Sequence, residues 1–135
     1  MSTNSFTCDF TVPENMIDEL GHVHYLNYRV MAEMAHKAFL AEHGLQIEEV
    51  TKMGSALFMR TDSCVYKRTL KEGDVVRISL ICKPETIATI LFNVTISIGD
   101  DVAAEITYIM TVVHYPSGRP KRLDQSPFKV LFETK

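Results

Sequence analysis

The chain of 135 residues contains no tryptophan, few cysteines and no long apolar run. A transmembrane helix needs about 20 consecutive apolar residues, so no membrane span is expected. The three cysteines, Cys8, Cys64 and Cys82, are odd in number and irregularly spaced. They predict neither a disulfide framework nor a zinc site, and they favour the reducing cytoplasm. Residues 1–15 lack the basic and apolar regions of a signal peptide, so none is predicted.

A basic excess is also missing, because 17 acidic side chains stand against 14 basic ones and give a formal net charge of -3. Proteins that bind nucleic acid normally carry a basic surface, so no nucleic-acid partner is expected. No stretch rich in proline, glycine or serine divides the sequence. The length and the ordinary hydrophobic content of 46% predict a single globular domain over residues 1–135.

Hydrophobic periodicity predicts one strand followed by one long helix. Apolar residues alternate from Phe6 to Val12, which is typical of a half-buried strand that Pro13 ends. From Asn27 to Gly44 they recur at helical spacing, at Tyr28, Met31, Ala32, Ala35, Phe39 and Leu40. The same spacing assigns other faces of the helix to Arg29, Glu33, His36, Lys37 and Glu42. Gly44 is the expected end, since glycine adopts the left-handed cap without strain.

The chain after about Ala56 is predicted to consist of strands. The expected strands span 56–70, 75–82, 87–98 and 102–115, and turn residues separate them at 71–74, 84–85 and 99–101. Consecutive strands with short connections imply an antiparallel sheet, against which the helix buries its apolar stripe. The predicted fold class is α+β.

The segment between the first strand and the helix carries the candidate chemistry. Asp18 lies just before the helix, whose free amides and positive dipole end keep a carboxylate ionised and can polarise a carbonyl. Gly21 allows a ligand to approach the backbone closely. His22 and His24 form a His-x-His pair, but without further ligands nearby they predict no metal site. A rival acid is Glu33, which lies on the helix.

This segment resembles the entry loop of hotdog-fold acyl-CoA thioesterases of the 4-hydroxybenzoyl-CoA thioesterase family. The matching positions are Asp18, Gly21, His22, Val23, Tyr25, Asn27 and Tyr28. Further matches are Glu33 and Ala35 on the helix, Gly44 at its end, and the turns Lys71-Glu72-Gly73-Asp74 and Gly118-Arg119-Pro120. Many members of the family carry two asparagines after the valine, whereas this chain has His24 and Tyr25.

The resemblance implies a hotdog fold, a long antiparallel sheet wrapped around one central helix, and hydrolysis of an acyl-CoA without metal or cofactor. It also implies a homodimer or homotetramer with active sites at the dimer interface. The catalytic residues would be Asp18 as nucleophile or general base, Tyr25 at the position of the carbonyl-polarising amide, and His22. The substrate-binding residues would be Gly21, Val23, His24 and Tyr28.

The CoA phosphates require basic partners. The predicted ones are Lys67, Arg68 and Lys83, with Arg119, Lys121 and Arg122 as further candidates. Two other functions remain open at this point, a non-catalytic protein that binds acyl-CoA and a hotdog hydratase or dehydratase. The acyl group also remains open between aromatic, short-chain, long-chain and betainyl groups.

Overall fold

The structure, a computed structural model, describes residues 2–133. Its strands are β1 (Asn4–Thr11), β2 (Ser55–Tyr66), β3 (Val75–Pro84), β4 (Thr89–Ile98) and β5 (Asp101–His114). Its α-helices are α1 (Tyr25–Glu42) and α2 (Ile47–Lys52). Three short 3-10 helices span Glu14–Met16, Leu123–Gln125 and Pro127–Phe132.

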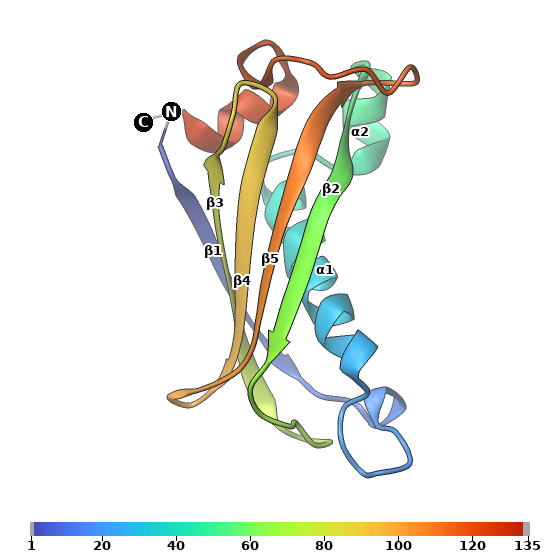
Figure 1. The fold of residues 1–135 in the computed structure, drawn as a ribbon, viewed down its shortest axis with the longest axis vertical. Coiled ribbons are helices and arrows are strands. Elements are labelled where there is room, and N and C mark those ends of the chain that lie inside the picture. Colours follow the sequence, from blue (N-terminus) through green and yellow to red (C-terminus); the bar gives the residue numbers. More distant parts are fainter. Residues whose placement is uncertain (1, 134–135) are drawn as a thin grey trace.

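The five strands form one antiparallel sheet in the order β1-β3-β4-β5-β2, and α1 lies along one face of it (Figure 1). β1 and β2 are therefore the two edges. The segment before α1, the β2–β3 connection and the β4–β5 turn lie at one end of the sheet. The helix α2 and the last two 3-10 helices lie at the opposite end. This arrangement confirms the predicted α+β hotdog fold.

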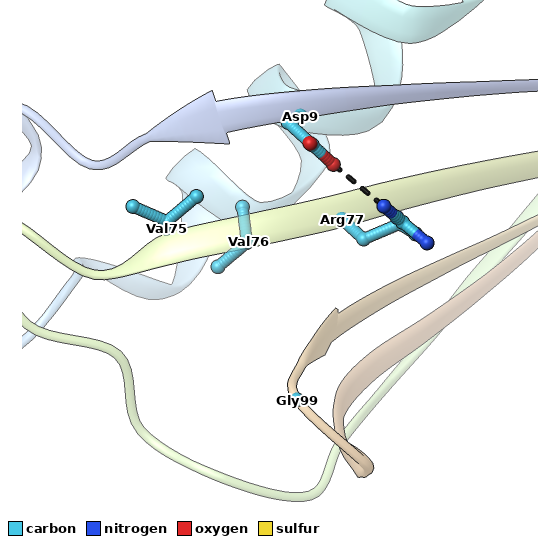
Figure 2. Close-up of a pocket in the computed structure, with 5 residues that line it drawn as sticks. All are labelled: Asp9, Val75, Val76, Arg77 and Gly99. Atoms are coloured by element: carbon cyan, nitrogen blue, oxygen red, sulfur yellow. Dashed lines mark hydrogen bonds and ion pairs between the residues drawn. The ribbon is translucent and has the colours of Figure 1, made fainter.

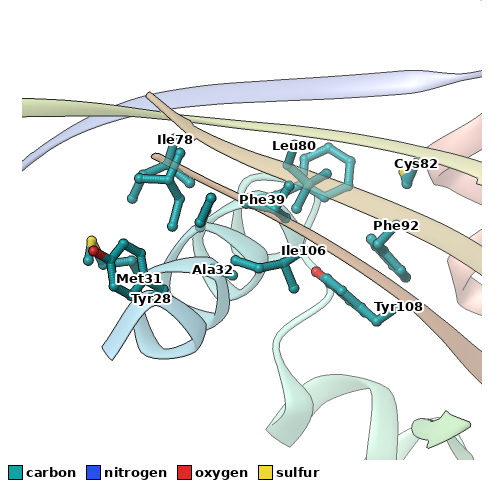
Figure 3. Close-up of a cluster of buried hydrophobic side chains, with 14 of the residues drawn as sticks. Tyr28, Met31, Ala32, Phe39, Ile78, Leu80, Cys82, Phe92, Ile106 and Tyr108 are labelled. Carbon is teal, nitrogen blue, oxygen red and sulfur yellow. The ribbon is translucent and has the colours of Figure 1, made fainter. Parts of the chain in front are cut away.

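The core lies between α1 and the sheet (Figure 3). Ile90, Phe92, Val94 and Ile96 of β4 are fully buried, and they alternate with partly buried residues as a pleated strand requires. They pack with the apolar stripe of α1, which comprises Tyr28, Met31, Ala32, Ala35 and Phe39. Burying one large apolar side chain contributes about 1.5–3 kcal/mol. The stripe therefore determines how α1 is placed on the sheet.

The helix α1 begins two residues before the predicted start, because His24 caps it. The Nδ1 atom of His24 accepts a hydrogen bond from the Leu26 amide at 3.3 Å. The predicted end is confirmed, since Gly44 has a φ angle of +72° just after the helix. The placement of His36 on a polar face is wrong. This side chain is buried, and its Nδ1 atom lies 2.8 Å from the Tyr108 hydroxyl.

Two further corrections concern the strands and the short helices. β2 ends at Tyr66 rather than at residue 70, and the last part of the chain forms 3-10 helices instead of continuing as strands and turns. These helices bury Leu123, Phe128, Leu131 and Phe132 against the core. The short α2 was not predicted either. Within residues 2–133, no helix is long and apolar enough to cross a membrane.

Candidate active-site loop

A tight hairpin holds Asp18 directly before α1. Ile17 and Val23 pair as an antiparallel bridge, and the Asp18 amide donates to the His22 carbonyl at 2.9 Å. The Gly21 amide donates to the Asp18 carbonyl at 3.1 Å, and Gly21 has a φ angle of +80°. Because side-chain-bearing residues rarely adopt this conformation, glycine is what allows the hairpin to close.

The hairpin is anchored on both sides. The Val23 amide donates to the Leu70 carbonyl at 2.8 Å, and the His24 amide donates to the Met16 carbonyl at 2.9 Å. The Val23 side chain is buried in the core. These contacts fix the loop between the first 3-10 helix and the β2–β3 connection, so Asp18 has a defined position at the start of α1.

The half-buried Asp18 carboxylate has one oxygen engaged and one available. Its Oδ1 atom accepts a hydrogen bond from the Leu20 amide at 2.9 Å and a long one from the His22 amide at 3.5 Å. Among residues 2–133, Oδ2 has no hydrogen-bond or ion-pair partner. One oxygen therefore orients the carboxylate, while the other can act on a ligand.

The first turn of α1 offers one free backbone donor. The Leu26 amide is capped by His24 Nδ1, and the Asn27 amide donates to the His24 carbonyl at 2.8 Å. Within the described part of the chain, the Tyr25 amide has no acceptor. This amide stands at the positive end of the helix dipole, where negative charge is stabilised. It is suited to polarising a carbonyl group.

Aromatic rings surround this helix start. Tyr25 is 58% exposed, its ring lies 4.7 Å from His24, and it meets the edge of Tyr66 at 6.3 Å. The Tyr28 ring lies 5.4 Å from Tyr66, and the Tyr28 hydroxyl donates to the Arg68 carbonyl at 3.1 Å. Tyr66 was not among the predicted residues, because only the fold brings the end of β2 beside the loop.

The predicted basic residues divide between the two ends of the sheet. Lys67 and Arg68 follow β2 at the same end as the loop, where Lys67 pairs with Glu105 at 3.4 Å and Arg68 pairs with Asp101. Lys83 is exposed near the end of β3, at the opposite end. Arg119, Lys121 and Arg122 follow β5 beside the start of β2, so of the predicted basic residues only Lys67 and Arg68 lie at the loop end.

The rival acid Glu33 lies farther along α1. It is eight residues beyond Tyr25, which corresponds to about 12 Å along a helix. Its Oε2 atom is 4.0 Å from the Arg29 guanidinium, and Arg29 also binds Asp62 of β2 at 3.0 Å. Glu33 therefore belongs to an ion-pair group between α1 and β2 and not to the hairpin.

Residues 2–133 give little support for a reactive thiol or a metal site. Burial raises the pKa of the Cys82 thiol to about 12, so this thiol stays protonated. Burial also raises the pKa of Cys8, and in this part of the chain no group of three metal-ligating side chains occurs. A hollow at the β1–β3 edge contains the Asp9–Arg77 ion pair and none of the predicted site residues (Figure 2).

Comparison with known proteins gives a family match and several structural matches. The model of the thioesterase-like superfamily matches residues 12–129. No curated protein matches the sequence. A 1,4-dihydroxy-2-naphthoyl-CoA thioesterase from Synechocystis superimposes with a TM-score of 0.85 at 18% identity, covering 94% of both chains.

Two further structures have the same fold. A protein from Staphylococcus aureus, solved in complex with CoA, has a TM-score of 0.84 and 23% identity, covering 97% of this chain and 83% of its own. A protein from Aquifex aeolicus has a TM-score of 0.83 and 24% identity, covering 93% of this chain and 98% of its own.

Proposed function

The chain belongs to the thioesterase-like superfamily, and on that premise we propose that it hydrolyses an acyl-CoA thioester to a free acid and CoA. The observation that carries this proposal is the pairing of two groups in one rigid hairpin and helix start. These are the Asp18 carboxylate, with one oxygen available, and the Tyr25 amide, which has no acceptor among residues 2–133. The CoA bound to the Staphylococcus aureus protein and the named activity of the Synechocystis enzyme support an acyl-CoA substrate.

The proposed reaction uses the two groups on one thioester. The carbonyl oxygen accepts a hydrogen bond from the Tyr25 amide, which stabilises the negative charge that develops in the transition state. Asp18 either attacks the carbonyl carbon to form a mixed anhydride, or it takes a proton from the water that attacks. In the first route CoA leaves as the thiolate, and water then hydrolyses the anhydride, which releases the free acid, regenerates Asp18 and supplies the proton that the thiolate takes up. In the second route the proton that Asp18 removes from water passes to the departing CoA thiolate. A backbone donor of this kind typically lowers the barrier by about 3–4 kcal/mol.

Release of free CoA thiol from a panel of acyl-CoAs, followed with a disulfide dye, tests the proposal. The Asp18→Asn variant keeps the shape of the side chain and removes its charge, so turnover is expected to fall by about 100-fold or more. Glu19→Gln is the matched control, since Glu19 is the exposed neighbouring acid in the same hairpin. The control should retain the wild-type rate.

Two other outcomes would contradict the proposed role of Asp18 or the proposed hydrolysis. Unchanged turnover in Asp18→Asn together with a loss in Glu33→Gln would move the chemistry to the helix. Binding of acyl-CoA without turnover of any thioester would identify a non-catalytic binding protein.

The same proposal includes a homodimer built through β2. This strand is an edge of the sheet, and four of its large apolar side chains are exposed, namely Phe58, Met59, Val65 and Tyr66. An edge strand with free backbone groups and apolar side chains favours pairing with another strand. In a twofold-symmetric dimer the two β2 strands would run antiparallel.

Antiparallel pairing would make each active site from two copies. Within one copy, Tyr66 at the end of β2 contacts the loop aromatics, whereas Ser55 at its start lies beside α2. Antiparallel pairing of the two β2 strands would bring the loop of one copy toward the α2 end of the other. Lys121, which donates to Ser55 at 2.7 Å, would then approach the partner's loop and CoA phosphates. Three free thiols fit the cytoplasm as the proposed compartment.

A further inference from the structure

A cleft separates the second half of α1 from α2 and the start of β2. Its volume is about 380 Å³, within the range of small-molecule sites. Its walls are mainly aliphatic, with Leu40, Val50, Leu57 and Met110 among the lining residues. Phe128 is the one phenyl ring among those residues. Flexible aliphatic walls favour an aliphatic ligand over a flat aromatic one, which packs best against other rings.

One nearly fully buried polar side chain belongs to the cleft. His36 lines it and is only 6% exposed. Its Nδ1 atom is engaged with the Tyr108 hydroxyl at 2.8 Å, and Nε2 has no hydrogen-bond partner among residues 2–133. Among the described residues Nε2 is not one of the fully buried atoms that lack a partner, so it keeps some access to the cleft that His36 lines. Nε2 is therefore the atom of this side chain available to a ligand.

The surroundings of His36 keep it neutral. Burial and the nearby positive charges of Arg29 and Lys37 lower its pKa to about 4. The Arg29 guanidinium lies 4.7 Å from the centre of the Tyr108 ring, and burial raises the pKa of the Tyr108 hydroxyl, which stays protonated. Depending on the tautomer, Nε2 of a neutral histidine is a donor or an acceptor. A ligand hydroxyl group can satisfy it in either case.

Charge around the cleft selects against ionised ligands. Glu33 and Glu48 line it together with Lys37, and the neutral His36 adds no positive charge. With Arg29, which pairs with Glu33, these charges balance, so the cleft offers no excess positive charge to bind a carboxylate. A quaternary ammonium would meet no cage of aromatic rings, because the walls are aliphatic.

We propose that this cleft holds the acyl chain of the thioester and that His36 selects an aliphatic acyl group carrying one hydroxyl. The inference rests on the proposed function, because the chain it binds is that of the proposed substrate. In one copy His36 is too far from the loop, since it is 11 residues beyond Tyr25, about 16 Å along α1. In the dimer proposed above, antiparallel pairing of β2 would bring the cleft toward the loop of the second copy.

Calorimetric binding to the 135-residue Asp18→Asn chain tests the inference without turnover. The probes are hexanoyl-CoA, its hydroxylated analogues at carbons 3 to 6, adipoyl-CoA and 4-hydroxybenzoyl-CoA. One hydroxyhexanoyl-CoA is expected to bind about tenfold more tightly than hexanoyl-CoA, as one additional hydrogen bond allows. Adding His36→Leu with Tyr108→Phe should abolish that preference and leave the Kd of hexanoyl-CoA within about threefold.

Replacing both His36 and Tyr108 avoids leaving the buried Tyr108 hydroxyl unpaired. The single variant His36→Gln should retain part of the preference for the hydroxylated acyl group. An independent surface variant, Ala41→Trp, fills the cleft, so it should weaken binding of every acyl-CoA and leave binding of CoA itself unchanged. Equal affinity for all hexanoyl-CoAs, a preference that survives the double substitution, or tighter binding of 4-hydroxybenzoyl-CoA or adipoyl-CoA would overturn the inference. Absence of wild-type turnover would refute only the hydrolysis, because these affinities do not depend on it.

Discussion

Tyr28 shows how a residue can match a family pattern and yet be engaged elsewhere. Its match suggests a substrate-binding residue, but its buried hydroxyl donates to the Arg68 carbonyl at 3.1 Å and accepts from the Leu70 amide at 3.2 Å. Leu70 is fully buried, and its carbonyl in turn receives the Val23 amide. The Tyr28 hydroxyl therefore joins α1 to the connection that supports the hairpin of Asp18.

Replacing Tyr28 by phenylalanine is expected to lower the free energy of unfolding by about 1–3 kcal/mol, because the Leu70 amide is left buried without a partner. Urea unfolding followed by circular dichroism measures this difference. Tyr115→Phe is the control, since Tyr115 is 47% exposed and should change stability little. Unchanged stability with a raised KM in Tyr28→Phe would instead favour the substrate-binding role.

The helix α1 has a conformational requirement at its C-terminal end. Gly44 has a φ angle of +72°, and its amide donates to the Ala41 carbonyl at 3.0 Å while the Leu45 amide returns to the Leu40 carbonyl at 2.8 Å. The buried Leu45 then begins the connection toward α2. The left-handed residue thus ends the helix and directs the chain toward the cleft.

Substituting alanine for Gly44 should reduce stability by about 1–2 kcal/mol, the cost of a left-handed conformation for a residue with a Cβ atom. Gly44→Asn should lose less, because asparagine adopts this conformation more readily. Thermal unfolding of both variants and of Glu42→Ala, an exposed residue of the same helix end, measures the effect. A Gly44→Ala protein as stable as Glu42→Ala would show that the cap conformation is not strained.

The elements that sequence predicts are those whose signal is local. The stripe of α1 and the alternation in β1 follow from spacing within each segment, and both are confirmed. The helix α2 has only six residues, of which Val50 alone is buried, so it carries no readable periodicity. The 3-10 helix at Pro127–Phe132 forms because its apolar residues complete a core built by distant strands.

The same distinction applies to the candidate site. The place of Asp18 and Gly21 before α1 is predictable because these residues are adjacent in the chain, whereas the hairpin that Ile17 and Val23 close was not predicted. The contribution of Tyr66 depends on the end of β2 reaching the loop, and that of His36 depends on a partner 72 residues away. Helical spacing places His36 among polar residues, and only the Tyr108 hydroxyl explains its burial.

At the scale of the whole molecule, a site built from two copies can be distinguished by experiment from a site within one copy. If the loop of one copy serves the cleft of the other, then a dimer carrying Asp18→Asn in one copy and Ala41→Trp in the other keeps one intact site. Such a heterodimer should have about half the wild-type turnover per dimer, because one of its two symmetric sites combines both normal parts. Each homodimeric variant should be nearly inactive.

Coexpression with two different affinity tags isolates this heterodimer, and thiol release measures its turnover. Light scattering must first show a dimer for the wild type. The double substitution Met59→Asp with Val65→Asp introduces charges on the β2 edge. It should convert the dimer to an inactive monomer that retains the circular dichroism of the fold. Both side chains are exposed in one copy, at 43% and 54%, so these substitutions disturb pairing and not the core. An inactive heterodimer would place the loop and its acyl chain within a single copy, whereas an active monomer would remove the need for a second copy.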